Sequence, residues 1–331
     1  MELFKKSVLM LLRISVSVML LIFLFNLVDK KSLIEIIKGA DKSLIVLAFL
    51  TLLATYSLCV LRWDMLLKAA HIHLPFGRVI ISSAGGLFFS LFLPSTIGGD
   101  LVRSIDLAVH TKKSHEVVAT VLLDRLSGYI GLVLIAILAV IFGWDLVHDN
   151  ASTLISVAVI SVILAVLLLV LFNSFIYSKI NKLLHSPGAG RIRGFIKDLH
   201  REVHIFRHHK VIVVNNLLLS LLIQAIAPVT FYIIALALGV KINMIYFFIF
   251  IPVIGAITLL PISLGGLGLR DATTIFFFAK AGVGKDLAFA MSLVSFSFIL
   301  IIGVLGGILY ALTVHHRRVQ YHKPRGVCPH P

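Results

Sequence analysis

LPSTIGGDLVR, residues 93–103, and LPISLGGLGLR, residues 260–270, are two copies of one pattern. Each copy has Leu-Pro, a hydroxyl residue two places on, an aliphatic residue, Gly-Gly, two variable residues, an aliphatic residue and Arg. Every matched position is separated by 167 residues, and the same offset superimposes the apolar runs that flank the two motifs. The sequence therefore predicts two copies of one structural unit, residues 44–142 and 211–309.

The composition decides the solvent in which this unit folds. The chain has 331 residues, 59% of them apolar, and a mean hydropathy of +1.06. Several nearly uncharged runs reach the length of about 18 or more residues that a membrane helix needs, and the ten-residue alternating segments of a membrane β-barrel are absent. The predicted fold class is an all-α polytopic membrane protein with about 8 membrane helices.

The net charge of +15 fits basic cytoplasmic loops that face anionic headgroups, and we expect no nucleic-acid partner. Arg62-Trp63-Asp64 combines an aromatic ring with charges, which is typical of a helix end at the membrane interface. The apolar and amphipathic runs predict helices at residues 8–28, 44–61, 79–93, 100–110, 119–142, 153–172, 211–238, 242–260, 272–281 and 287–312.

Loop charge orients these helices. The loop at residues 174–210 carries eight Lys or Arg, and the tail at residues 316–331 is also basic. We therefore expect both termini and this loop to be cytoplasmic, in a single transmembrane domain of residues 1–315 in the cytoplasmic membrane. The segment at residues 29–43, with four Lys, runs against this pattern. With this orientation the two copies are inverted, which is typical of transporters.

The motifs themselves predict broken helices. Proline removes a donor, and Gly-Gly permits unusual backbone conformations, so each motif should end one half-helix and begin another. Inside a membrane such a break is tolerated where it is buried or lines a wet cavity. Whether each motif segment is re-entrant or spans the membrane stays open.

Such a break can bind an anion. Free amides at the start of each new half-helix, with an arginine in or near its first turn, suit a phosphate group. The predicted lipid-headgroup-binding residues are Arg103, Arg270, Gly98, Gly99, Gly265 and Gly266. The alternative is that the breaks are structural and that each arginine pairs with a carboxylate, the candidates being Asp100, Asp106 and Asp271.

Further ionisable residues fall inside apolar runs. A charge inside the membrane is costly, and such a residue commonly marks a functional site. The predicted polar path or gate consists of Asp100, Asp124, Arg125 and Asp271. If Asp124 and Arg125 lie deep in the membrane, they belong to the cavity; if they lie at the interface, they form an ordinary ion pair.

The sequence predicts no catalytic residue, no metal site and no cofactor. His200, His204 and His208 recur on one helix face, but this spacing is more typical of a basic surface facing the membrane than of a metal site. Residues 282–286 lack the first glycine and the Ser or Thr of a P-loop.

With its two motifs and with Asp124-Arg125 in the context VLLDRLSG, the chain resembles the lysylphosphatidylglycerol synthase transmembrane-region family, also called the flippase-like domain family. The resemblance covers roughly residues 5–315. It implies an integral membrane domain that moves aminoacylated phospholipids, or lipid-linked sugars and related glycolipids, between leaflets. The soluble aminoacyl-transfer domain of the synthase is not seen here, so lysine transfer is not implied. The second motif has Leu267 where the first has Asp100, so the two half-sites should differ.

We therefore expect a non-enzymatic, flippase-like transporter of an anionic or phosphate-bearing lipid: a phospholipid, a glycolipid or a polyprenyl-phosphate-linked sugar. Membrane lipids are its expected partners. The alternative is a non-catalytic membrane partner of a glycosyltransferase or a lipid-modifying enzyme. A membrane-embedded enzyme that acts on headgroups is a third reading.

Overall fold

The computed structural model describes residues 15, 17–93, 96–111, 113–148, 151–172, 210–259, 263 and 266–321. Regular structure in this part of the chain is helical throughout. After a helix at Ser17–Leu27, the helices are α2 (Lys30–Lys38), α3 (Lys42–Ala69), α4 (Phe76–Phe92), α5 (Thr96–Thr111), α6 (Ser114–Phe142), α7 (Trp144–Val147), α8 (Ala151–Phe172), α11 (Lys210–Ala237), α12 (Ile245–Thr258), α13 (Leu269–Ala279) and α14 (Lys285–Tyr321).

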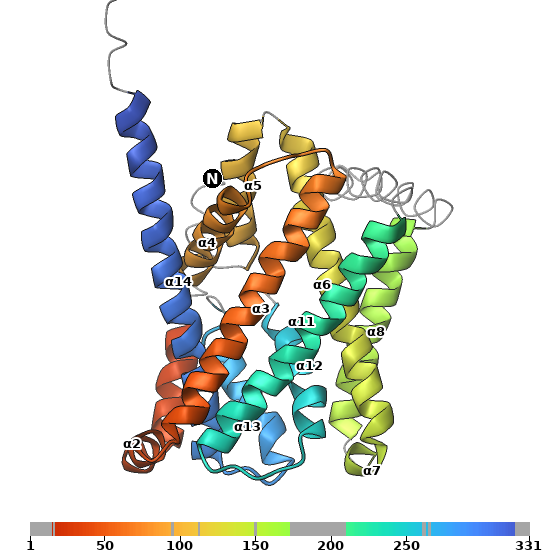
Figure 1. The fold of residues 1–331 in the computed structure, drawn as a ribbon. Helices are drawn as coiled ribbons and strands as arrows, with labels where there is room; N and C mark the ends of the chain where they lie inside the picture. The colour runs from red at the N-terminus through yellow and green to blue at the C-terminus, as the bar shows by residue number, and fades with distance from the viewer. Residues whose placement is uncertain are drawn as a thin grey trace, which may run out of the picture.

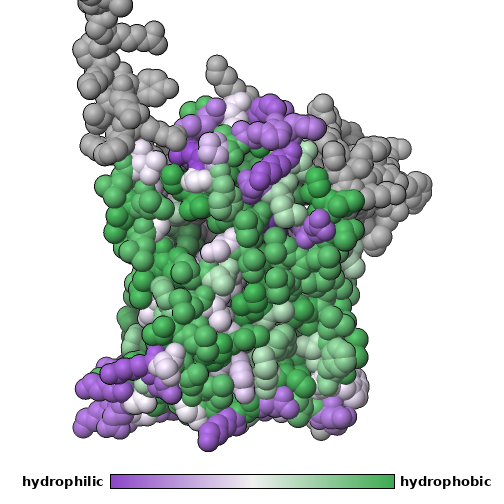
Figure 2. All heavy atoms as spheres, viewed as in Figure 1, coloured by the Kyte–Doolittle hydropathy of each residue, from purple (hydrophilic) through white to green (hydrophobic). Residues whose placement is uncertain are grey.

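Four of these helices are long and apolar enough to cross a membrane: α3, α6, α11 and α14. They run the length of the molecule in Figure 1. Figure 2 shows a hydrophobic band around the middle of this face, with hydrophilic residues gathered at its two ends. This distribution is what a protein needs when its middle faces lipid tails and its ends face water. The prediction of an all-α polytopic membrane protein agrees with it.

Each predicted unit also holds a pair of shorter helices. In the first unit, α4 and α5 have 17 and 16 residues and pack against each other; in the second, α12 and α13 have 14 and 11. All four fall short of the about 20 residues that span a bilayer. The α4–α5 pair lies near one end of the molecule and the α12–α13 pair toward the other (Figure 1).

Hydrogen bonds fix the direction of the central helices. The amide of Asp41, which begins α3, donates to the carbonyl of Ala237, which ends α11. Near the other end, Asn216 Nδ2 of α11 donates to the carbonyl oxygen of Arg62 in α3. These two long helices therefore run antiparallel along their length.

Each short-helix pair packs against a long helix of the other unit, α4 on α14 and α12 on α6. Glycine makes the first contact close: a Cβ atom added at Gly306 would lie 3.1 Å from the carbonyl oxygen of Ala84. Small residues at such crossings let two membrane helices gain dispersion contacts and stabilise the pair.

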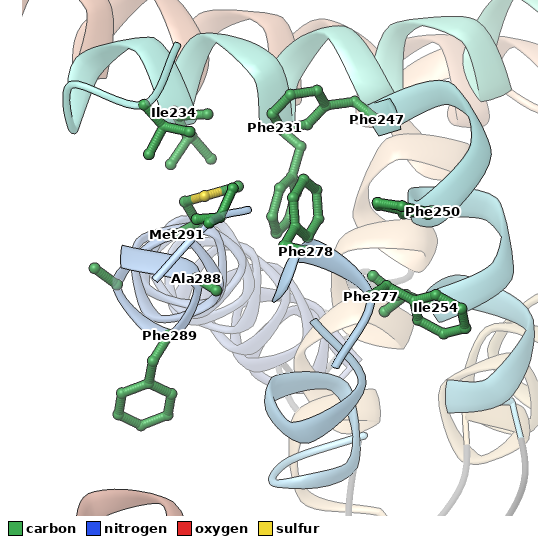
Figure 3. Packing of buried hydrophobic residues seen from close by; sticks show 14 of the residues in the cluster. Phe231, Ile234, Phe247, Phe250, Ile254, Phe277, Phe278, Ala288, Phe289 and Met291 are labelled. Carbon is green, nitrogen blue, oxygen red and sulfur yellow. The ribbon is translucent and has the colours of Figure 1, made fainter. Parts of the chain in front are cut away.

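The largest buried apolar cluster is centred on the second unit and extends to residues of the first, such as Ala48 and Ala136. Phe278 of α13 is fully buried, with its ring centroid 4.9 Å from that of Phe247 and 5.4 Å from that of Phe250, both of α12. Phe231 of α11 stacks on it at 6.3 Å (Figure 3). Such ring contacts stabilise beyond their area burial. They fix α13, which contains Arg270, against α11 and α12.

Several predicted helix boundaries were wrong: α6 begins at Ser114, before residue 119, α14 continues to Tyr321, beyond residue 312, and α2 was not predicted. Two further errors concern a charged segment and a motif glycine pair. Helix α3 continues to Ala69, so Arg62, Trp63 and Asp64 do not end it at the interface and are instead buried at 6%, 0% and 6% exposure. Helix α5 begins at Thr96, before the Gly-Gly pair that was expected to precede it. Both errors arise because a charge or a glycine has the same local signature whether neighbouring helices cover it or not.

Candidate functional site

The first motif contributes to a buried network of three arginines and two aspartates. Arg62 Nε of α3 lies 2.8 Å from Asp124 Oδ1 of α6, and Arg103 Nη2 of α5 lies 3.0 Å from Asp124 Oδ2. Asp100, also of α5, accepts from Arg103 at 3.0 Å and from Arg125 of α6. The network therefore joins α3, α5 and α6 through alternating charges.

Most of the side chains in this network are removed from water, so their charges carry a desolvation cost that the ion pairs must offset. The side chains of Arg62 and Asp124 are 8% and 6% exposed, those of Arg103 and Asp100 12% and 13%, and that of Arg125 31%. An ion pair out of water is stable only when its remaining donors and acceptors are also satisfied. The network is thus deepest at Asp124 and most open at Arg125.

Neighbouring polar groups meet part of that need. Arg62 Nη1 donates to Ser220 Oγ of α11 at 3.1 Å. The guanidinium of Arg103 lies 4.5 Å from the ring centroid of Trp63, whose Nε1 donates to Thr120 Oγ1 at 3.1 Å. A cation over an indole face is attracted by the ring quadrupole. Trp63 therefore holds the Arg103 head in place.

The second motif builds a smaller site. Arg270 Nη2 lies 3.0 Å from Asp271 Oδ1, and Arg270 Nε lies 3.1 Å from Ser292 Oγ of α14. Ser292 Oγ also donates to Asp271, and Asp271 Oδ2 accepts the amide of Gly268, which begins α13. Asp271 is fully buried, and its two oxygens are used by the cap at the start of α13 and by the ion pair with Arg270.

The predicted glycines differ between the copies. Gly98 and Gly99 lie in the first turn of α5, where Gly99 allows close contact with α4: an added Cβ atom would overlap the carbonyl oxygen of Gly86. Gly266 has a φ of +79° in the turn before α13, and Gly265 lies outside the described residues. Gly268, with a φ of +77°, is the helix-starting glycine that sequence reasoning missed.

The expected link between helix N-terminus and arginine holds for one copy only. Arg270 is the second residue of α13, but Arg103 is the eighth of α5, about 10 Å along the axis from its start. The prediction that Arg103 lies in or near the first turn was wrong. The helix dipole therefore acts near Arg270, while carboxylates determine the charge around Arg103.

Both arginines are paired, as the structural alternative expected, with Asp100 for Arg103 and Asp271 for Arg270. Asp106, the third candidate, instead contacts Arg78 of α4. Asp124 is covered by neighbouring helices within the network, and its depth in the membrane, which separates its two readings, stays a prediction.

Sequence reasoning missed three polar side chains of this region: Arg62, Arg78 and Ser220. Arg62 was read as an interfacial residue, and the lone Ser220 inside an apolar helix gave no signal. Arg78 is 5% exposed, and its partner Asp106 also meets Tyr310 Oη of α14 at 3.4 Å. This cluster ties the α4–α5 pair to α14.

Chemically, the first network offers guanidinium groups in a region shielded from water. Guanidinium forks match phosphate and carboxylate oxygens, and a low dielectric strengthens that attraction. In the described part of the chain, no group of three or more His, Cys, Asp or Glu side chains lies close enough to hold a metal ion. His200, His204 and His208 lie outside that part.

Two comparisons of the sequence identify proteins that resemble this chain. The family model described as the lysylphosphatidylglycerol synthase TM region matches residues 10–307. A UPF0104 membrane protein of Pyrococcus horikoshii is 25% identical over 303 residues, covering 83% of this chain and 89% of that relative. The chain therefore belongs to the lysylphosphatidylglycerol synthase transmembrane-region family and is a multi-pass membrane protein.

Proposed function

We propose that this protein is a flippase-like transporter, not an enzyme, that carries an anionic or phosphate-bearing lipid between the leaflets of the cytoplasmic membrane, with both termini cytoplasmic. The observation that carries the proposal is the buried Arg62–Asp124–Arg103 network, in which Arg62 and Asp124 lie on α3 and α6, two helices that are long and apolar enough to span a membrane, and Arg103 lies on the short helix α5. Charge held at such depth is costly, and in membrane proteins it commonly marks a substrate path.

The arrangement of the helices supports transport. We infer that residues 44–142 and 211–309 form an inverted-topology repeat in which α4–α5 and α12–α13 are re-entrant pairs. In support, α3 and α11 run antiparallel, and the short pairs lie toward opposite ends (Figure 1). Rocking of one inverted repeat against the other is a general route to alternating access.

The lipid phosphate would bind to the arginines of the first network, its acyl chains remaining in the surrounding lipid. Arg103 is the central group because it joins α5 of the short-helix pair to Asp124 of the long helix α6. An incoming phosphate can exchange with a carboxylate on Arg103 without leaving any guanidinium unpaired. Such exchange lets binding at the site coincide with movement of the short-helix pair.

Transfer in reconstituted vesicles tests the proposal. Purified protein is placed in proteoliposomes that carry an acyl-labelled fluorescent phosphatidylglycerol, and a membrane-impermeant reductant reports the fraction of label in the outer leaflet. We expect label to leave the inner leaflet faster than in protein-free vesicles. Arg103→Gln should lower the rate about 10- to 100-fold, because a hydrogen bond to a charged group contributes about 1.5–3 kcal/mol.

A matched control removes a positive charge outside the network. Lys113 is exposed just before α6, and its Nζ donates only to the carbonyl of His71 among the contacts described. Lys113→Gln should leave transfer within about twofold of the unsubstituted protein, as expected for an exposed charge. Failure of the protein to move phosphatidylglycerol, a glycolipid or a polyprenyl-phosphate sugar above empty vesicles would refute transport. Stable co-purification with a glycosyltransferase would then favour a partner role.

A further inference from the structure

One face of α3 runs from α14 to the first network. Phe49, Tyr56 and Trp63 recur every seven residues, so they lie on the same side of this helix. Phe49 meets Phe298 of α14 edge-on, with ring centroids 5.4 Å apart. Trp63, at the other end, lies under the guanidinium of Arg103. Tyr56 is midway, about 10 Å along the helix axis from each of the other two rings.

The second arginine site lies beside the same face. Helix α14 holds Arg270, whose Nε donates to Ser292 Oγ at 3.1 Å and whose guanidinium carbon lies 4.8 Å from the ring centroid of Phe296. The charge of Arg270 acts on the phenol of Tyr56. Tyr56 therefore faces the second arginine site and also lies on the side of α3 that reaches the first network.

Cys59 continues this face toward the first network. It lies three residues beyond Tyr56, within one turn on the same side of α3, and the two side chains interact electrostatically. The charges of Arg62 and Arg103 act in turn on the thiol of Cys59. Tyr56 and Cys59 thus lie between the two arginine sites.

Three polar groups along this face are not used by the described part of the protein. Tyr56 is half-buried, and its hydroxyl has no hydrogen-bond partner among the described residues, although a phenol removed from water usually finds one. Nη1 of Arg103 and Nη1 of Arg270 also lack a partner there. All three groups can donate, so a ligand with several acceptor oxygens, such as a phosphate, suits them.

We propose that Tyr56 is a headgroup-binding residue, whose hydroxyl donates to the phosphate of a lipid on the face of α3 between Arg103 and Arg270. The proposal rests on the proposed function and deepens it, because the two arginines become the ends of one polar path. A phosphate that leaves a guanidinium away from water loses stabilisation. A phenol at the midpoint offsets part of that loss while the lipid is between the arginines, and contributes little when the lipid is bound at either one.

Tyr56→Phe tests this role, because it removes the hydroxyl and keeps the ring. In the vesicle assay we expect phosphatidylglycerol transfer to fall about tenfold, at the low end of what a hydrogen bond to a charged group contributes. Phosphatidylglycerol retained by the detergent-solubilised full-length protein, quantified by mass spectrometry, should change much less, because both arginines remain. An unchanged transfer rate overturns the proposal. Equal losses of rate and retention also overturn the midpoint role, since they indicate a general effect on the structure.

Tyr232→Phe is the matched control. Tyr232 is a half-buried tyrosine of the long helix α11, and its ring centroid lies 5.3 Å from that of Phe247. No contact among the described residues joins it to Arg103 or Arg270. Its substitution should leave both transfer and retention unchanged, and a loss of transfer equal to that of Tyr56→Phe overturns the assignment to Tyr56.

Cys59 provides a test that does not require transport. Cys328→Ser leaves Cys59 as the one thiol of the chain. An anionic methanethiosulfonate reagent is added to this variant in detergent at pH 8.5, and modification is followed by mass spectrometry. We expect Cys59 to react, and phosphatidylglycerol at twice its Kd to slow the reaction about threefold by occupying the site. A thiol that reacts only after denaturation in sodium dodecyl sulfate overturns the path.

Two competitors identify what is recognised. Diacylglycerol lacks the phosphate, and inorganic phosphate lacks the acyl chains, so each should protect Cys59 less than phosphatidylglycerol does. Equal protection by diacylglycerol overturns phosphate recognition, and equal protection by inorganic phosphate overturns the assignment to a lipid.

The two proposals can fail separately. Transfer that Tyr56→Phe leaves unchanged would support transport and refute the role of Tyr56. Protection of Cys59 by phosphatidylglycerol without transfer in vesicles would support headgroup binding on this face and refute the transporter.

Discussion

Asp124→Asn is the substitution that most directly tests the buried network. It keeps the size of the side chain and removes the carboxylate that bridges Arg62 at 2.8 Å and Arg103 at 3.0 Å. At an effective dielectric of about 20, each of these pairs has a gross Coulomb attraction of roughly 5–6 kcal/mol. Most of that attraction offsets desolvation, and the net cost of removing one partner of a buried pair is about 3–5 kcal/mol.

Arg62 carries most of this cost. Arg103 keeps Asp100 and the Trp63 face, but Arg62 is left with Ser220 as its described side-chain partner. We therefore expect Asp124→Asn to lower the free energy of unfolding by about 3–5 kcal/mol. Because Arg62→Gln removes the stranded charge, the double variant should lose less than the sum of the two single variants, with a coupling energy of about 1–3 kcal/mol.

The assay is reversible unfolding of the purified protein by sodium dodecyl sulfate in mixed micelles, followed by circular dichroism. Asp64→Asn is the comparison variant, because Asp64 of α3 is also buried but its partner Lys68 has a side chain that is 57% exposed and stays hydrated when the carboxylate is removed. Because no charge is left buried without a partner, this substitution should cost only about 0–1 kcal/mol. If Asp124→Asn and Asp64→Asn lower the unfolding free energy equally, by under about 1 kcal/mol, the reasoning about a buried network is refuted.

The remaining predictions concern packing and a helix cap. Gly99→Ala should destabilise by about 1–3 kcal/mol, because the new methyl group overlaps the backbone of α4, whereas Gly77→Ala, with open space around it, should be neutral or slightly stabilising in the same unfolding assay. Phe278→Ala should cost about 3–5 kcal/mol there, and a loss below about 1 kcal/mol would contradict the packing in Figure 3. At the start of α3, hydrogen bonds from Ser43 lower the pKa of Asp41 below its ordinary value of 3.8. The stabilisation from this cap is therefore full above about pH 4 and is lost as the pH falls further. In the unsubstituted protein, amide exchange at Ser43 should become faster only below that pH. In Asp41→Ala the faster exchange should already be present at neutral pH.

Much of the fold follows from local sequence. Apolar runs of sufficient length predicted the long helices, because a membrane helix must satisfy its own backbone and cover it with apolar side chains. The 167-residue offset predicted matching elements in the two halves, and Arg103 and Arg270 lie in corresponding short helices, α5 and α13, although at different distances from the helix start. The boundaries at Arg62 and at Gly98 were wrong, because neighbouring helices decide whether a charge or a glycine interrupts a helix.

The sequence by itself determined the membrane class and the pair of motif arginines, since both depend on composition, spacing and residue type along one chain, and from the same kind of signal it predicts the duplicated unit. Only the tertiary structure decided which carboxylate each arginine contacts and how deep the pair lies. Asp124 is 62 residues from Arg62 and 21 from Arg103, and nothing local to any of them specifies that the three meet. The crossing of α3, α5 and α6 brings them together, because apolar helix faces can be covered by protein as well as by lipid and a buried charge is stable only beside its counter-ion.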